Sequence, residues 1–337
     1  MRPDYVEAVL EEARQLDFEV QSPRPAAADR LAPVLITVVR DERSAMEGFL
    51  AHYRQRGVRE FVVIDNGSTD GTPDMLAAED DVTVTPVDRP FHWTAKQAWI
   101  MRVIETIGFH RWYLVVDADE RVVFSGDDHY SFSSLAAHME LEGQWRVRGV
   151  LVDMYGPGPL LEAPEGPLES THTLFDAEGY HEALTGQMVS VKGGPRRRAF
   201  RADGIELDPE LSKYPLFKLA EGELMANPHH HWPYEENFKS PCYLGILHYK
   251  FGAGLREKIG NAIAEKNYWN DSAEYRAYQA AFADDPALSL AFDGSRRYTS
   301  PGDLVDCGLL RSPEWKKHRW PRRLKQARAR LAGLVKS

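Results

Sequence analysis

The fold of this chain is decided by three stretches: VLITVV at residues 34–39, EFVVID at 60–65 and WYLVV at 112–116. Each is a short apolar run rich in β-branched residues, which is typical of a strand buried on both faces. Helical patterns lie between and after these runs, at residues 44–56, 94–107 and 131–141. A short strand is expected at 82–84 and a further strand at 145–153. This alternation predicts an α/β fold with a Rossmann-like, mostly parallel sheet and flanking helices.

The rest of the chain divides into segments of different character. Residues 1–32 are predicted to form a helix (1–21) followed by a proline-containing linker, and residues 33–155 hold the regular alternation. Residues 156–253 are rich in Gly, Pro and His and predict an irregular half with short strands. Residues 254–337 are predicted to be helical and to end in a basic tail. Two helix starts match capping boxes, Ser44 with Glu47 and Thr94 with Gln97.

Composition limits the function classes. The 337 residues carry a formal charge of −10, so a general nucleic-acid binder is not expected. Two cysteines cannot form a disulfide framework, and no apolar run is long enough for a membrane span. The first 20 residues form an acidic amphipathic pattern rather than a secretory signal. These features predict a cytoplasmic protein.

The basic tail has two interpretations. Residues 322–335, RRLKQARARLAGLV, place apolar side chains on one face of a helix and cations on the others. Such a helix favours peripheral contact with anionic lipid at the inner membrane face. The alternative is that this helix packs against the acidic body of the protein.

Polar clusters follow three of the predicted strands: Arg40-Asp41-Glu42, Asp65-Asn66-Gly67-Ser68-Thr69-Asp70 and Asp117-Ala118-Asp119-Glu120. Because ligands of open parallel sheets bind at the carboxyl ends of the strands, we expect the three clusters to meet in one site. Asp117 and Asp119 predict a Mg²⁺ or Mn²⁺ site shared with substrate phosphates.

The other two clusters predict contacts with a nucleotide. Asp65, Asn66, Ser68 and Asp70 are candidates for binding a nucleoside, although the same residues also suit a turn that caps the next helix. Arg40 is a candidate for a diphosphate and Glu42 for a base or ribose, with a surface ion-pair cluster as the alternative.

Together, VVRDE, FVVIDNGSTDGT and WYLVVDADE resemble family 2 glycosyltransferases of the GT-A fold, most closely the bacterial branch related to family 92. The resemblance covers about residues 33–155, which it makes the nucleotide-sugar-binding half, and LSKYPLFKL (211–219) and ILHYKF (246–251) extend it into an acceptor and metal half. It implies inverting, metal-dependent transfer from a nucleotide-sugar donor, a UDP-sugar, to a glycan or glycolipid acceptor. By the same resemblance Asp65 contacts the nucleobase, and Asp117 and Asp119 contact the ribose and the metal.

Further site residues are expected in the later half. The resemblance implies a metal-binding His, for which the candidates are His230 and His248, with His229 and His231 beside them. Arg196 and Arg198 lie in a glycine-flanked basic loop that suits a diphosphate or, alternatively, a solvated turn. Asp153 is the candidate general base, and a structural role for it in capping the following loop is the alternative.

Other functions stay open at this point. A metal-dependent phosphohydrolase would also place carboxylates after a strand, but Arg121 stands where such an enzyme needs Thr. A sugar nucleotidyltransferase would need a Gly-rich loop after the first strand, which residues 40–48 lack. A non-catalytic nucleotide- or polysaccharide-binding protein of the same fold is the remaining alternative.

Overall fold

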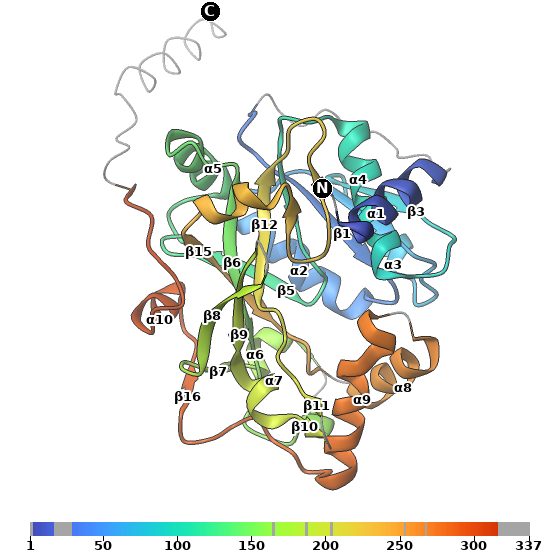
Figure 1. Cartoon of the computed structure of the whole chain (residues 1–337), viewed down its shortest axis with the longest axis vertical. Coiled ribbons are helices and arrows are strands. Elements are labelled where there is room, and N and C mark those ends of the chain that lie inside the picture. Colours follow the sequence, from blue (N-terminus) through green and yellow to red (C-terminus); the bar gives the residue numbers. More distant parts are fainter. Residues whose placement is uncertain are drawn as a thin grey trace, which may run out of the picture.

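A computed structural model describes residues 3–16, 29–163, 166–185, 188–202, 205–252, 254–266 and 268–315 (Figure 1). Its centre is an eight-stranded sheet of order β3-β2-β1-β4-β12-β6-β15-β5. The strands are β1 Val34–Val39, β2 Phe61–Asp65, β3 Val82–Pro86, β4 Trp112–Val115, β5 Glu120–Phe124, β6 Arg146–Asp153, β12 Ser212–Lys218 and β15 Cys242–His248. Four of the seven neighbouring pairs are parallel, so the predicted α/β fold with a mostly parallel sheet is confirmed.

Helices cover both faces of the sheet because successive strand residues point to opposite sides. Val34 and Ile36 pack with α1 (Asp4–Gln15) and α4 (Trp93–Ile107). Leu35 packs on the other face, with α2 (Arg43–Gln55) and α5 (Phe132–Leu141). The short helix α3 (Thr72–Ala77) follows the loop after β2. The apolar strands are thus buried on both faces of the sheet, as their continuous hydrophobic sequences predict.

Residues 156–315 add smaller elements to this core. They are η1 Leu160–Glu162, α6 Leu168–Thr171, β7 Leu174–Asp176, β8 Tyr180–Thr185, β9 Met188–Gly193, α7 Gly194–Ala199, β10 Arg201–Ala202, β11 Ile205–Glu206, β13 Leu224–Met225, β14 His231–Trp232, η2 Tyr234–Lys239, α8 Leu255–Glu265, α9 Trp269–Asp284, β16 Ser295–Arg297 and α10 Pro301–Asp306. Helices α8 and α9 share a separate hydrophobic cluster with Tyr155 and Phe200. The segments 33–155 and 156–253 contribute strands to one sheet, since β12 and β15 flank β6.

Strand β12 is a full member of the sheet, whereas the sequence pattern predicted only short strands in this region. The pattern is obscured by Pro215, which cannot donate a hydrogen bond to a neighbouring strand. The pairing of β12 with β6 shifts register between Lys213 and Leu216, and this irregularity accommodates the proline in a central strand.

The two predicted capping boxes are wrong. Helix α2 begins at Arg43 without a side-chain cap, so Ser44 lies inside its first turn. Helix α4 begins at Trp93, and the side chain of its N-cap, His92, accepts a hydrogen bond from the Thr94 backbone N–H. Each helix therefore starts earlier than the motif placed it.

Two other predictions fall at the chain ends. The N-terminal helix is present as α1, and residues 17–21 of its predicted span lie outside the described residues, as does the basic tail at 322–335. Within the described segments, no helix combines the length and the apolar character needed to cross a membrane.

Candidate functional site

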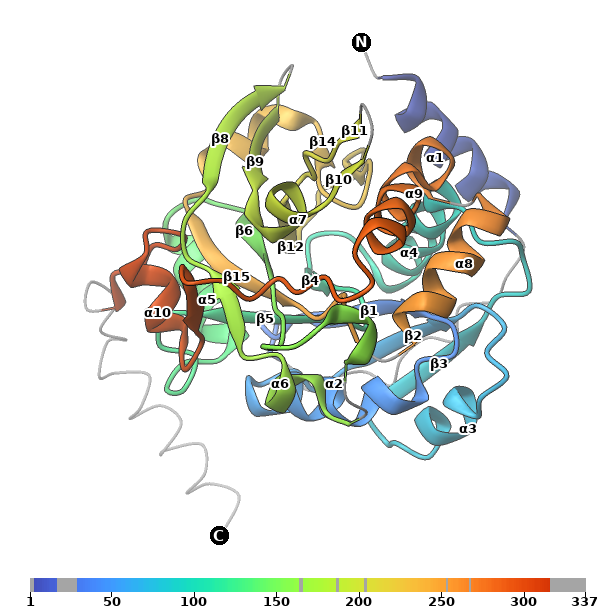
Figure 2. The ribbon, with the colours of Figure 1, turned by 90° about the horizontal axis from the view of Figure 1, so that it is seen from below.

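Almost all of the candidate residues lie at one end of the sheet, where the parallel strands finish; we call this end the carboxyl edge. Strands β1, β2, β4, β6 and β15 run in one direction and end at this edge, while β5 and β12 run the opposite way and begin there. The edge therefore carries Glu42, Asp65, Asp117, Asp119, Glu120, Asp153, Lys213 and His248. Figure 2 shows α8 and α9 on one side of this region, with α7 and the β8–β9 hairpin on the other.

Asp117 is held by two lysines. Lys96 of α4 forms an ion pair with Oδ1, and the Lys213 Nζ lies 3.5 Å from Oδ2. Burial acts to raise the pKa of Asp117, but the charges of Lys213 and Lys96 outweigh it and lower the pKa below its usual range. Asp117 is therefore a carboxylate with its charge already neutralised by the protein.

Glu120 forms the base of the same loop. The Lys213 Nζ donates to both carboxylate oxygens, at 2.8 and 2.6 Å, and the Asp117 backbone N–H donates to Oε2 at 3.0 Å. The Glu120 side chain is buried, which raises its pKa against the effect of Lys213. This buried pair fixes the turn that presents Asp117 and Asp119.

Asp119 faces His248 at the end of β15. The His248 Nε2 lies 3.6 Å from the Asp119 Oδ2, and the His248 Nδ1 lies 2.6 Å from the Asp153 Oδ1. Burial acts to lower the pKa of His248, but the charges and hydrogen bonds of Asp119 and Asp153 raise it to about 9. The imidazole is thus fixed between two carboxylates. The Lys258 Nζ of α8 is 3.8 Å from Asp119.

Asp153 lies behind His248 and is 1% exposed. Its Oδ2 accepts a 2.8 Å hydrogen bond from the Arg196 Nε, and the Arg196 Nη1 donates to Glu274 at 2.9 Å. Both Asp153 oxygens therefore have partners, one on Arg196 and one on His248. These contacts favour a positioning role for Asp153 over the base role predicted from the sequence. They also place the Arg196 guanidinium in a buried ion-pair network.

Arg198 points elsewhere. Its Nε and Nη2 donate to the Asp176 carboxylate at 2.9 and 3.0 Å, at the end of β7. The structure shows no hydrogen bond or ion pair between Arg198 and any described residue of the sheet-edge site, so it does not bring this candidate to the clustered aspartates.

The end of β2 presents a buried carboxylate with a free acceptor. Asp65 is 5% exposed, and its Oδ2 accepts a hydrogen bond from the Ser68 backbone N–H at 3.2 Å. Its Oδ1 is buried and has no hydrogen-bond partner within the described chain. A buried acceptor left unpaired is costly, so this atom suits a ligand donor.

The remaining loop candidates hold the loop itself. The Asn66 Nδ2 donates to the carbonyls of Val87 and Arg89, and the Ser68 Oγ accepts from the Asp41 backbone N–H at 2.9 Å. Asp70 accepts from the backbone N–H groups of Arg43, at 3.0 Å, and Thr72, at 2.9 Å. The turn chemistry considered as an alternative is therefore present in the structure.

Glu42 and Arg40 lie at the end of β1. Burial raises the pKa of Glu42 to about 7, assisted by the negative charges of Asp119, Asp117 and Asp70 and opposed by Lys258. Arg40 is exposed and forms no ion pair with a described residue. Both side chains remain available to a ligand at this edge.

The three consecutive histidines pack against β12 instead of joining the aspartates. The His229 Nδ1 and His231 Nε2 lie 2.9 Å from the carbonyl oxygens of Ser212 and Tyr214. Burial lowers the pKa of His229 to about 4 and that of His231 to about 3. His230 lies 3.9 Å from Glu210. No described contact joins these rings to the two aspartates, so His248 is the metal-ligand candidate that the structure places beside them.

The donor set at Asp119 and His248 suits a divalent ion that shares its coordination with substrate. Among the described residues, no group of three or more His, Cys, Asp or Glu side chains is arranged to hold a metal. Mg²⁺, however, is commonly bound by one or two protein ligands together with substrate phosphates and water. The contact between the His248 Nδ1 and Asp153 also matches the carboxylate that usually orients a metal-binding His.

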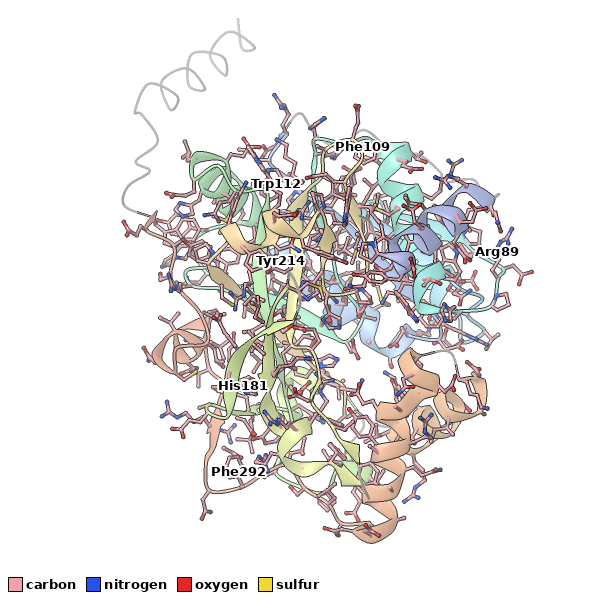
Figure 3. The ribbon with its side chains drawn as sticks, in the orientation of Figure 1. Arg89, Phe109, Trp112, His181, Tyr214 and Phe292 are labelled. Atoms are coloured by element: carbon pink, nitrogen blue, oxygen red, sulfur yellow. The ribbon has the colours of Figure 1, made fainter. Side chains whose placement is uncertain are left out.

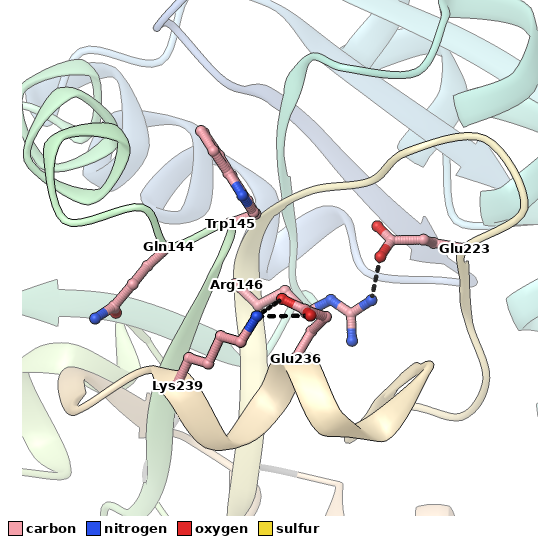
Figure 4. Close-up of a pocket in the computed structure, with 6 residues that line it drawn as sticks. All are labelled: Gln144, Trp145, Arg146, Glu223, Glu236 and Lys239. Carbon is pink, nitrogen blue, oxygen red and sulfur yellow. Dashed lines mark hydrogen bonds and ion pairs between the residues drawn. The ribbon is translucent and has the colours of Figure 1, made fainter.

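A small cavity lies at the opposite end of the sheet strands, near the start of β6 (Figure 4). Its volume is about 10 Å³, enough for about one water molecule. The buried Arg146 guanidinium fills this region and donates to Glu223 at 3.0 Å. The cavity is part of the structural support of β6.

Sequence reasoning missed Lys96, Lys258 and Glu274, which reach the site from helices.

The chain has few similarities to known proteins. No protein-family model and no curated protein matches the chain. A solved structure described as "Crystal structure of 4-diphosphocytidyl-2C-methyl-D-erythritol synthase" is similar over 56% of this chain and 74% of its own, with 14% identity and a TM-score of 0.28. A likeness this weak carries no argument about function.

Proposed function

We propose that this chain is a metal-dependent glycosyltransferase that moves a sugar from a nucleotide diphosphate donor, a UDP-sugar, to a hydroxyl of a glycan or glycolipid. The observation that carries the proposal is the line Asp119–His248–Asp153 at the carboxyl edge of the sheet, close to the Asp117 turn. The motifs that resemble family 2 and the family 92 branch fall on this same edge.

The nucleoside and the diphosphate of the donor each have partners in this proposal. The unpaired Asp65 Oδ1 accepts a hydrogen bond from a base N–H or a ribose hydroxyl. Asp119 and His248 hold Mn²⁺ or Mg²⁺, which when bound stabilises the negative charge on the leaving diphosphate. Lys258 and Arg40 supply cationic donors to the phosphate oxygens.

The proton of the acceptor hydroxyl needs a separate acceptor in an inverting reaction. Asp153 has both oxygens occupied by Arg196 and His248, so here it positions the imidazole rather than taking a proton from substrate. In this role Asp153 acts as an orienting carboxylate behind a metal ligand. Inversion at the sugar carbon stays a prediction.

The experiment is incubation of the full chain with UDP-glucose, UDP-galactose, UDP-N-acetylglucosamine and GDP-mannose, with Mn²⁺ or with EDTA. We expect Mn²⁺-dependent release of nucleoside diphosphate and sugar from one of these donors, because glycosyltransferases slowly transfer to water. Asp119→Asn should abolish the release. Nucleoside monophosphate and sugar 1-phosphate as the products would instead indicate a phosphohydrolase that cleaves the diphosphate bond. Nucleoside triphosphate and sugar 1-phosphate, formed only when pyrophosphate is added, would indicate a nucleotidyltransferase. Binding of a donor without any turnover would indicate a non-catalytic module.

A further inference from the structure

A large cavity lies away from the Asp119–His248 site. Its volume is about 680 Å³, within the range of small-molecule sites. The walls come from the turn after β7, from α7 and from the turn before β16. In Figure 3 the labelled Phe292 and His181 mark this lower part of the molecule, far from Trp112 at the start of β4.

The floor of the cavity is a fixed network. The Asp176 carboxylate accepts hydrogen bonds from Arg198 and from the Tyr155 hydroxyl, and the Tyr155 hydroxyl also lies 2.9 Å from the Ser295 Oγ. The Arg198 Nη2 donates to the Leu290 carbonyl at 2.7 Å. Because these groups satisfy one another, the floor is rigid and offers little charge to a ligand.

An aromatic platform stands on this floor. The Arg198 guanidinium carbon lies 4.0 Å from the centroid of the Phe292 ring, so it covers one face of the ring. Phe292 is nevertheless 46% exposed. A cation stacked behind a ring restrains the ring in one orientation. The structure thus holds an exposed aromatic surface in place inside a cavity, where a flat apolar ligand face can pack on it.

The rim of the cavity carries both acidic and basic side chains that can form hydrogen bonds. Glu178, Asp293 and Arg296 line the cavity and are exposed. The side chains of these three residues form no hydrogen bond or ion pair with another side chain of the described segments. The lining has three acids and three arginines, the other members being Asp176, Arg197 and Arg198, so its formal charge sums to zero.

This charge balance restricts the chemistry of the ligand. A strongly anionic or cationic molecule gains little from a site whose charges cancel. A polyhydroxylated ligand can instead donate to the two rim carboxylates and accept from Arg296. The C–H face of a pyranose ring is the apolar surface that such a ligand offers to an aromatic ring.

We infer that this cavity binds a neutral saccharide, with one sugar ring stacked on Phe292 and its hydroxyls bonded to Glu178, Asp293 and Arg296. Binding of the saccharide is independent of the proposed transfer reaction. Its use as a holding site for the acceptor glycan rests on that proposed function. Helix α7 connects the two places, since Arg196 reaches Asp153 and the next two residues line the cavity.

The test uses neutral tetrasaccharides of glucose, mannose and galactose, with a glucuronate-containing tetrasaccharide as the charged comparison. Binding to the full chain is measured by saturation-transfer NMR and by titration. Phe292→Ala is compared with Phe238→Ala, because Phe238 is 47% exposed on η2 and does not line the cavity. We expect at least one neutral probe to bind, with affinity about tenfold or more lower in Phe292→Ala and unchanged in Phe238→Ala.

Several outcomes would overturn the inference: no neutral probe binds the unmodified chain, the charged probe binds in preference, or the two Phe variants behave alike. Binding is measured without nucleotide or metal, and again in Asp119→Asn. If saccharide binding fails while Mn²⁺-dependent sugar release persists, only this inference is lost. If binding persists in a chain that releases no sugar from any donor, the transferase proposal fails alone.

Discussion

Replacing Asp153 with Asn should weaken metal binding at Asp119 and His248 without removing either ligand. The variant loses the carboxylate that bonds the His248 Nδ1 at 2.6 Å and fixes the ring toward Asp119. Loss of such an orienting carboxylate typically costs about 10–100-fold in metal affinity, which is about 1.4–2.8 kcal/mol. The Arg196 guanidinium still forms its 2.9 Å ion pair with Glu274 in this variant, so Arg196 is not left unpaired.

The matched control is Asp176→Asn. Asp153 and Asp176 are both buried, and each accepts a hydrogen bond from an arginine of α7, at 2.8 and 2.9 Å. Both variants should therefore lose similar stability. The assay is the Mn²⁺ concentration that gives half-maximal sugar release from the UDP-sugar. We expect it to rise about 10–100-fold in Asp153→Asn and to stay unchanged in Asp176→Asn.

Two results would refute this reasoning. An unchanged Mn²⁺ requirement in Asp153→Asn, with a kcat lowered by a large factor, would return Asp153 to the role of general base. An equal rise in both variants would mean that the effect is a general consequence of removing a buried ion pair rather than of orienting His248.

Three further predictions concern the donor site and stability. Lys258→Met should weaken nucleotide diphosphate binding about tenfold or more, the usual scale of a lost charge-assisted hydrogen bond, while Arg256→Met, two residues away on a different face of α8, should leave the calorimetric affinity unchanged. Asp65→Ala should weaken the same binding by about 1–3 kcal/mol through loss of a buried acceptor, and unchanged calorimetry would contradict its assignment to the nucleoside. The folded-state pKa of His231 is lowered to about 3, so the unfolded state binds more protons and is favoured as the pH falls below about 6.5. Urea unfolding at pH 7 and at pH 4.5 should show that the native chain loses about 2–3 kcal/mol more unfolding free energy than His231→Gln does. Equal losses in the two proteins would contradict this.

The strands and their shared edge could be predicted because local sequence determines them. Continuous apolar runs identify buried strands, and parallel strands must end on one side of a sheet. The three polar clusters therefore meet where the sequence places them. Strand β12 could not be predicted in the same way, because Pro215 breaks the local pattern and only the register shift against β6 accommodates it.

The missed site residues depend on tertiary packing. Lys96 and Lys258 lie on helices, and sequence periodicity does not show which end of a helix reaches the sheet edge. The histidine run that contains His230 suggested a metal site from its composition alone. In the structure its two neighbours, His229 and His231, bind carbonyl groups of β12 instead. Asp153 is a candidate from its place after a strand. Its partners Arg196 and His248 come from distant segments, so the sequence alone does not reveal the contacts that favour a positioning role.

The most direct test of the proposed function is a crystal structure of the full chain with UDP and Mn²⁺, in which anomalous scattering locates the manganese. We predict one strong manganese peak within bonding distance of Asp119, the His248 Nε2 and diphosphate oxygens, with the uridine hydrogen-bonded to the Asp65 carboxylate. Manganese bound away from these two side chains, or UDP bound elsewhere than the carboxyl edge of the sheet, would contradict it.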